Sequence, residues 1–256
     1  MENKVVFITG GGAGIGRASA LRFGREGYHV ALLDMESSST VAAQSALMKA
    51  SVEVEACVGD VSDPTASEKL AARALERWGR IDALVANAGA RVYGSLLEAT
   101  AADWERIIGV NLKGVAYCAQ AVLPAMVRQQ RGAVVIISSA NALVGRAGMP
   151  LYDATKAAVL SLTRSLAVAH GKDGVRVNAI CPGFTVTDFH ERAAAERGLS
   201  PEELRQRSAG YGLLGRPAEP SEIAAAVYFL ASDDAAMITG QTLMVDAGLS
   251  VTSGAR

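Results

Sequence analysis

A tyrosine and a lysine four residues apart carry the clearest proton-transfer chemistry in this sequence. Tyr152 and Lys156 stand at the start of an expected helix, so their side chains share one face. A tyrosine phenol is a poor base near neutral pH, because its unperturbed pKa is about 10. An ammonium about 4 Å away, at an effective dielectric of about 20, interacts by roughly 4 kcal/mol and lowers a phenol pKa by about three units. The pair could therefore exchange a proton with an alcohol oxygen, although the spacing alone is more often a surface coincidence.

A glycine cluster near the N-terminus predicts a dinucleotide site. Residues 9–16 read Thr-Gly-Gly-Gly-Ala-Gly-Ile-Gly, between an apolar run and an amphipathic segment. Such glycines let the backbone approach a pyrophosphate, and the helix that follows offers free N–H groups. Asp34 ends the next apolar run, where a carboxylate accepts hydrogen bonds from adenosine ribose hydroxyls and repels a 2′-phosphate. The pattern favours NAD over NADP, with two alternatives open: Asp34 as a helix cap, and Arg17 as a nearby cation that weakens the preference.

The elements that must position these groups alternate along the whole chain. Apolar residues at consecutive positions suit parallel strands that helices cover on both faces. The expected strands are residues 5–9, 30–34, 52–58, 83–87, 133–138, 175–180 and 242–245. The expected helices are residues 15–26, 38–50, 66–78, 104–128, 151–170 and 220–230. This alternation predicts an α/β fold with a doubly wound parallel sheet, whose ligands lie at the carboxyl ends of the strands.

The chain reads as one domain, residues 1–256, because no Pro/Gly-rich linker, repeat or low-complexity tract divides it. Residues 184–215 are polar, helix-prone and follow a strand end, which is where a substrate lid would lie. Residues 154–169 are apolar on more than one helix face, which is typical of a helix buried against the core or a partner subunit. We therefore expect a homodimer or homotetramer.

Composition excludes several classes of protein. The 25 basic and 26 acidic side chains nearly cancel, unlike the strongly basic face of a nucleic-acid-binding protein. The three cysteines and three histidines are far apart, which argues against disulfides and a metal site. We see no signal peptide, and no apolar run close to the roughly 20 residues that span a bilayer. The expectation is a cytoplasmic protein with a small-molecule substrate and no nucleic-acid or membrane partner.

The sequence resembles the short-chain dehydrogenase/reductase family over nearly its whole length. It matches that family's glycine loop, the pair after the third strand that contacts adenine, the Asn-Ala-Gly turn after the fourth, and the Pro-Gly loop that holds the nicotinamide carboxamide. The resemblance implies a single-domain Rossmann fold with a seven-stranded parallel sheet in the order 3-2-1-4-5-6-7. The predicted cofactor contacts are Gly10, Gly14, Ile15, Gly16, Asp34, Asp60, Val61, Asn87, Ala88, Gly89, Tyr152, Lys156, Pro182, Gly183, Thr185 and Thr187.

The same resemblance implies a catalytic set of Ser139, Tyr152, Lys156 and Asn111. Ser139 stands thirteen residues before Tyr152, the spacing of the family's serine on the substrate oxygen, with Ser138 as the competing candidate. Tyr152 then transfers the alcohol proton, Lys156 lowers the pKa of that tyrosine and holds the nicotinamide ribose, and Asn111 holds a water of the proton relay. The chain departs from the family at Ala86, where many relatives have asparagine. It departs again at residues 246–248, Asp-Ala-Gly in place of Asp-Gly-Gly.

The substrate is less well determined by the sequence. The candidate contacts near the expected site are Arg91, Asn141, Arg146, Met149, Phe184 and His190. If an arginine faces inward, an anionic substrate fits the guanidinium fork; otherwise Leu143, Met149, Leu151 and Phe184 leave an apolar pocket for a cyclic or aliphatic alcohol. We expect a small secondary alcohol or ketone, such as a polyol or hydroxy acid.

Two other functions compete with this prediction. One is an NADPH-dependent carbonyl or 3-oxoacyl reductase, which needs a cation beside the adenosine ribose. The other is a non-catalytic NAD sensor, against which the intact catalytic set argues.

Overall fold

Within residues 3–251, which the computed structural model describes, seven parallel strands form one sheet in the order β3-β2-β1-β4-β5-β6-β7. This confirms the predicted Rossmann architecture and strand order. The strands are β1 (Val5–Thr9), β2 (His29–Asp34), β3 (Val54–Val58), β4 (Ala83–Ala86), β5 (Gly132–Ile137), β6 (Val175–Pro182) and β7 (Thr242–Val245). Every residue of β1, β4 and β5 is buried, which explains why their sequences show no apolar–polar alternation.

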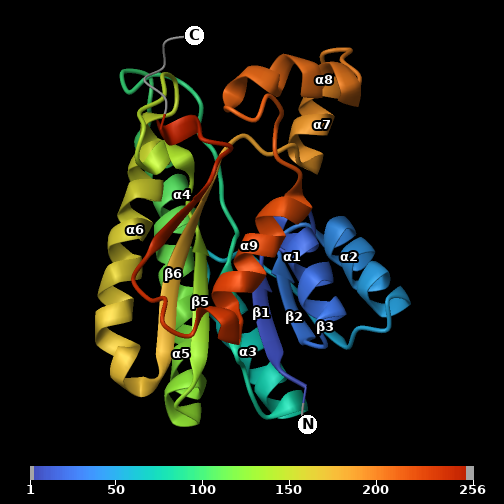
Figure 1. Cartoon of the computed structure of the whole chain (residues 1–256), viewed down its shortest axis with the longest axis vertical. Helices are drawn as coiled ribbons and strands as arrows, with labels where there is room; N and C mark the ends of the chain where they lie inside the picture. The colour runs from blue at the N-terminus through green and yellow to red at the C-terminus, as the bar shows by residue number, and fades with distance from the viewer. Residues whose placement is uncertain (1–2, 252–256) are drawn as a thin grey trace.

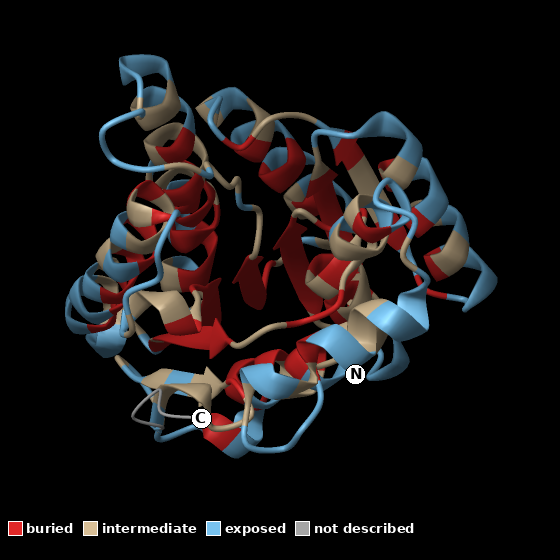
Figure 2. Ribbon diagram, turned by 90° about the horizontal axis from the view of Figure 1, so that it is seen from above, coloured by how far each residue is buried: buried red, intermediate tan, exposed pale blue. Residues whose placement is uncertain are grey.

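Helices cover the sheet in two layers (Figure 1). One layer holds α1 (Gly14–Arg25), α2 (Ser37–Lys49) and α9 (Pro220–Ala231); the other holds α3 (Pro64–Trp78), α5 (Gly114–Gln129) and α6 (Pro150–His170). Successive strand residues point to opposite faces, so Val6 and Ile8 pack under the first layer while Val5 and Phe7 pack under the second. Viewed from above, the buried sheet lies between the two helical layers (Figure 2).

The single helix expected at residues 104–128 is wrong in both its start and its continuity. α4 (Ala101–Ile108) starts earlier, because Thr100 and Asp103 form a reciprocal capping box. A π-helical turn, Gly109–Lys113, then separates α4 from α5. π-turns of this kind often occur at functional sites, and this one contains Asn111. Apolar periodicity could not reveal the turn, since the apolar pattern continues through it.

The same stretch bears on the predicted absence of a membrane span. Among the described residues, Ala101–Gln129 is long and apolar enough to cross a membrane by length and composition alone. However, 44% of its most apolar window is buried inside the fold. Val122 and Met126 belong to the hydrophobic core cluster that also contains residues of α3 and of the sheet. The helix is thus accounted for as a core helix of this domain.

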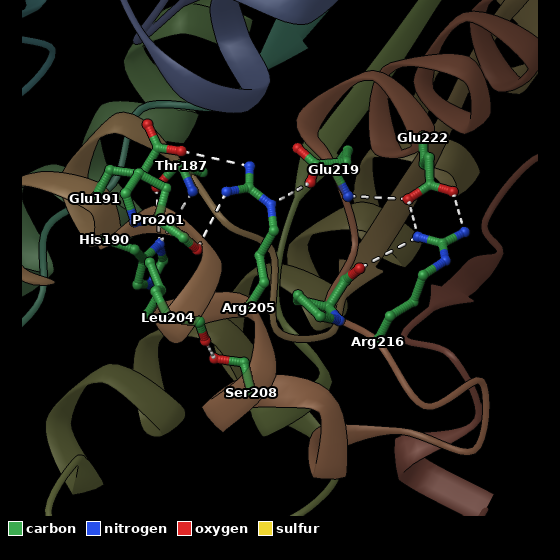
Figure 3. Close-up of polar contacts among 11 residues, drawn as sticks. Thr187, His190, Glu191, Pro201, Leu204, Arg205, Ser208, Arg216, Glu219 and Glu222 are labelled. Atoms are coloured by element: carbon green, nitrogen blue, oxygen red, sulfur yellow. Dashed lines mark hydrogen bonds and ion pairs between the residues drawn. The ribbon is translucent and has the colours of Figure 1, made fainter. Parts of the chain in front are cut away.

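The 184–215 segment forms two short helices above the carboxyl ends of the strands (Figure 1). α7 (Asp188–Ala195) and α8 (Pro201–Ser208) are followed by a 3₁₀ turn, Ala209–Tyr211. Arg205 of α8 bonds Glu191 of α7 at 3.4 Å and Glu219, just before α9, at 3.0 Å (Figure 3). Partly exposed ion pairs of this kind contribute about 1 kcal/mol or less each, so this segment is held less firmly than the core.

The two departures from the family pattern have different structural consequences. Ala86 is buried in β4 and fits the sheet. Ala247 adopts φ +54°, a left-handed conformation that glycine favours, in the turn after β7. The Asp246 carboxylate holds this turn by accepting the backbone N–H groups of Gly248 at 3.0 Å and Ser250 at 2.8 Å.

Candidate active site

The glycine turn between β1 and α1 is packed against the end of β4. Gly10 has φ +62°, and a Cβ on Gly16 would overlap the Gly10 carbonyl oxygen. The Asn87 amide donates to the carbonyl oxygens of Thr9 and Gly10, both at 3.0 Å. Only glycine fits at these positions, and Asn87, predicted as a cofactor contact, acts here by holding the loop in place.

A carboxylate from the 184–215 segment binds the start of α1. The Gly14 N–H donates to Asp188 Oδ2 at 2.8 Å, and Arg17 donates to Asp188 Oδ1 at 2.9 Å. Burial raises the pKa of Asp188, but the bonds from Gly14 and Arg17 outweigh it and leave that pKa below its usual value. An anionic oxygen on this N–H shows that the donor set suits a pyrophosphate oxygen. The sequence analysis missed Asp188, because its partners lie more than 170 positions earlier.

Asp34 ends β2 beside the same turn. Its carboxylate accepts the backbone N–H groups of Gly12 at 2.9 Å and Glu36 at 3.0 Å. The helix cap of α2 is Glu36, so Asp34 is not the cap that the alternative interpretation required. Arg17, the cation that could have served a 2′-phosphate, is paired with Asp188 instead.

The other predicted cofactor residues lie at strand ends along the same edge of the sheet or at the start of α1. Asp60 holds its turn by accepting the Ser62 N–H at 2.9 Å, and the Ala88 N–H donates to Thr9 Oγ1 at 3.1 Å. Thr185 is buried and bonds the Gly183 carbonyl at 3.2 Å. The complete set here is Ile15, Asp60, Val61, Ala88, Gly89, Pro182, Gly183, Thr185 and Thr187.

Tyr152 and Lys156 lie in the first two turns of α6. Lys156 Nζ is 5.7 Å from the Tyr152 ring centre and donates to the Ile137 carbonyl, at the end of β5, at 2.8 Å. Burial, and secondarily the charge of Arg91, lowers the pKa of Lys156 from 10.5 to about 8. The buried Ser138 hydroxyl donates to the Lys156 carbonyl at 2.7 Å, so it anchors α6 to β5. Ser139 thus stays the predicted serine for substrate, with Ser138 in a structural contact.

Asn111 connects three elements around this pair. Its Oδ1 accepts the Ala90 N–H at 2.7 Å, while Nδ2 donates to the Ala90 carbonyl at 3.0 Å and to Thr155 of α6 at 3.1 Å. Ser139, just beyond β5, accepts the Asn141 N–H at 3.2 Å. The four residues predicted to be catalytic thus come together at the carboxyl ends of β4 and β5.

Comparison with known proteins identifies this arrangement. A family model described as enoyl-(acyl carrier protein) reductase matches residues 10–250. Meso-2,3-butanediol dehydrogenase from Serratia marcescens is 42% identical over 253 residues, covering 99% of this chain and 97% of its own. The chain belongs to the short-chain dehydrogenase/reductase family. It is therefore an oxidoreductase of secondary alcohols and ketones that uses a nicotinamide cofactor.

Solved structures of short-chain dehydrogenases/reductases share the whole fold. The crystal structure of levodione reductase is 36% identical, with a TM-score of 0.90 over 97% of this chain and 98% of that one. A variant of actinorhodin polyketide ketoreductase, solved with NADPH, is 31% identical, with a TM-score of 0.91 over 98% of both chains.

The predicted substrate residues of this dehydrogenase/reductase fall into two groups. The Asn141 side chain and the Arg146 backbone N–H both donate to Asp153, at 3.0 and 3.1 Å. Asp153, which no sequence pattern pointed to, thus holds this loop against α6. The Arg146 side chain is exposed. Met149 is buried at the start of α6. In contrast, Arg91, Phe184 and His190 contact one another. His190 Nε2 lies 3.1 Å from Arg91 Nη1, and the His190 and Phe184 ring centres are 4.9 Å apart.

The cysteines and metal-type side chains form no further cluster among the described residues. Cys57, Cys118 and Cys181 are free and buried. Among the residues that the structure describes, no three His, Cys, Asp or Glu side chains form a group that could hold a metal ion.

Proposed function

We propose that this protein is an NAD-dependent dehydrogenase of a small secondary alcohol, with Ser139, Tyr152, Lys156 and Asn111 as its catalytic set. The observation that carries the choice of NAD is the Asp34 carboxylate at the end of β2, 2.9 Å from the Gly12 N–H. A carboxylate at this point of a Rossmann fold accepts the ribose hydroxyls and repels a 2′-phosphate.

The chain's own residues divide the chemistry into positioning and one proton transfer. When bound, NAD supplies the hydride acceptor. Ser139 holds the reacting oxygen, and Tyr152 accepts the alcohol proton in oxidation and returns it in reduction. The Lys156 ammonium, fixed by the Ile137 carbonyl and 5.7 Å from the centre of the Tyr152 ring, would hold the nicotinamide ribose. Asn111 fixes the π-helical turn beside which a water relay would reach solvent.

The glycine turn and its neighbours would hold the cofactor. The N–H groups at the start of α1 would donate to the pyrophosphate, in place of Asp188 at Gly14, and Asp34 would accept from the adenosine ribose. Asp60 and Val61 would contact the adenine, and Thr187 the carboxamide. Since Asp188 binds the Gly14 N–H, α7 reaches over this part of the site, which supports the 184–215 segment as a lid.

An NADPH-dependent carbonyl or 3-oxoacyl reductase is the second candidate. The family-model description and the NADPH-bound polyketide ketoreductase favour it. It requires a cation beside the adenosine ribose, whereas Arg17 is engaged by Asp188.

Self-association is part of the proposal. α6 exposes small and apolar side chains along one face, among them Ala154, Ala157, Ser161 and Val168, the last 86% exposed. A second copy could cover this face in a homodimer or homotetramer, and light scattering that gives a monomer at micromolar concentration would contradict it. We also place the protein in the cytoplasm, acting on small molecules rather than nucleic acid or membrane.

The deciding experiment is fluorescence titration with NADH and NADPH of the wild type and Asp34→Ala. We expect tight NADH and weak NADPH binding, with the gap between them narrowed at least about tenfold in the variant, which is roughly 1.4 kcal/mol. Asp233→Asn, which removes the same charge at the opposite end of the sheet, is the control and should leave both affinities unchanged. A wild type that prefers NADPH would overturn the assignment and favour carbonyl reduction.

A further inference from the structure

The Arg91 side chain extends from the turn after β4 to the 184–215 segment. It follows the Asn-Ala-Gly turn after β4, and its guanidinium lies 5.0 Å from the Phe189 ring centre and 3.1 Å, through Nη1, from His190 Nε2. Arg106 fixes the Arg91 backbone by donating to its carbonyl at 3.2 Å. The side chain is half-buried, so its orientation is set by these contacts.

Arg91 follows two residues that border the proposed catalytic set: a Cβ on Gly89 would lie 3.4 Å from Lys156 Nζ, and the Ala90 N–H donates to Asn111 Oδ1 at 2.7 Å. The Arg91 charge is the second cause, after burial, of the lowered pKa of Lys156. Burial and then Arg91, with a contribution from Arg146, also lowers the pKa of His190 to about 4. The carboxylates in this part of the molecule are engaged elsewhere: Asp188 with Arg17, Glu191 with Arg205, and Asp153 with the 141–146 loop. Among residues 3–251, no carboxylate contacts the Arg91 guanidinium.

His190 makes this guanidinium part of a fixed array. A guanidinium only donates, so Nε2 of the neutral imidazole must accept from Arg91, and the ring proton is then on Nδ1. In that tautomer Nδ1 donates to Thr187 Oγ1 at 2.9 Å, and the Thr187 backbone N–H lies 3.3 Å from the same nitrogen. One N–H of the Arg91 guanidinium is thus bonded to the neutral His190 ring, and its remaining N–H groups are available for an anion.

We propose that Arg91 binds a carboxylate of the substrate, so that the alcohols oxidised by this enzyme are small hydroxy acids. This inference rests on the proposed function. A partly buried guanidinium near a second cation is unfavourable unless an anion completes it, and its planar fork matches a carboxylate. Arg91 recognises the carboxylate, and the reacting hydroxyl of the same molecule meets Tyr152.

The reaction balances as a two-electron oxidation that leaves the carboxylate unchanged. The carbinol C–H bond breaks and its hydrogen leaves with the electron pair to NAD⁺, which becomes NADH. The hydroxyl proton leaves to Tyr152 and from there to solvent. The hydroxy acid becomes a keto acid.

The test compares a hydroxy acid with its own neutral amide. We would measure kcat/KM for 3-hydroxybutanoate, 3-hydroxybutanamide and 2,3-butanediol with NAD⁺, in the wild type, Arg91→Gln, Arg91→Lys and Arg192→Gln. Arg192 is an exposed arginine of α7, so its variant removes the same charge from the same helix that carries His190. The wild type should prefer the acid over the amide by at least about 30-fold.

Arg91→Gln should lower kcat/KM for the acid at least about 30-fold while changing the amide and the diol less than about threefold. Arg91→Lys should retain part of the preference, since it keeps the charge and loses the fork. Arg192→Gln should match the wild type. Equal use of acid and amide by the wild type, or an equal loss on both in Arg91→Gln, would overturn the inference. Activity on none of the three alcohols would instead overturn the proposed function on which it rests.

Discussion

Charged side chains are partnered differently at the two ends of the sheet. At the amino ends of the strands, buried charges have partners within the fold. Asp82 accepts the Val5 N–H at 2.8 Å and pairs with Arg80 at 2.6 Å. Arg176 donates to the carbonyls at the end of α9, including Leu230 at 2.7 Å and Ser232 at 2.9 Å. These groups stabilise the fold, because each satisfies a donor or acceptor that would otherwise be buried unpaired.

At the carboxyl ends, Arg17 is paired with Asp188, but Lys156 and Arg91 have no carboxylate partner among residues 3–251. Lys156 is 3% exposed, bonds only a neutral carbonyl and lies within electrostatic range of Arg91. Such sites are unfavourable for stability and are kept where a ligand or a reaction requires them. Polar residues at the amino ends therefore stabilise the fold, whereas the unpaired cations at the carboxyl ends are available to a ligand.

The largest expected effect is on catalysis at the carboxyl end. Tyr152→Phe removes the proton carrier and should lower kcat about 10²–10⁴-fold, with a much smaller effect on the NADH dissociation constant, since only one of the predicted cofactor contacts loses its hydroxyl. Steady-state rates and fluorescence titration measure the two quantities. If this variant kept wild-type turnover, the assignment of function to this end of the sheet would fail.

At the amino end, Arg176→Met should act on stability alone. It leaves the last carbonyls of α9 without their charged donor, so the free energy of unfolding should fall by about 2–3 kcal/mol while kcat stays the same. Urea denaturation followed by circular dichroism measures the first quantity. Asp233→Asn is the control from the same end: its pairs with Lys4 and Arg131 are exposed and should contribute less than about 1 kcal/mol. A large loss of kcat in Arg176→Met would contradict the comparison.

Lys156→Met tests whether activity and stability have opposite requirements at the carboxyl ends of the strands. The variant should be inactive yet more stable than the wild type at pH 7 by roughly 1–2 kcal/mol, because it removes a buried charge. The folded pKa of Lys156, about 8, lies below the usual 10.5. Between these values the unfolded chain binds more protons than the folded one, so wild-type stability should rise with pH across this window. Urea midpoints at pH 7, 8.5 and 10 should show the extra rise in the wild type and not in the variant.

Much of the fold follows from local sequence. The consecutive apolar residues of β1, β4 and β5 predicted buried parallel strands, and the glycines around Gly10 and Gly16 predicted the turn that joins β1 to α1. Both are properties of neighbouring residues: strand burial depends on a run of side chains, and a tight turn depends on the absence of a Cβ. The boundaries were less accurate, as the split between α4 and α5 shows.

Residue types and spacing predicted the Tyr152–Lys156 pair and an acid at the end of β2, and the family resemblance added Ser139. Tertiary structure decided how those groups are used. Asp188 reaches the Gly14 N–H, Asn111 joins the β4 loop to α6, and Arg91 meets His190 across 99 positions of sequence. No local pattern encodes such pairs, because their partners come together only when parallel strands end at the same edge of the sheet. The buried charge of Lys156 has the same origin, since packing, not residue type, sets the desolvation that lowers its pKa.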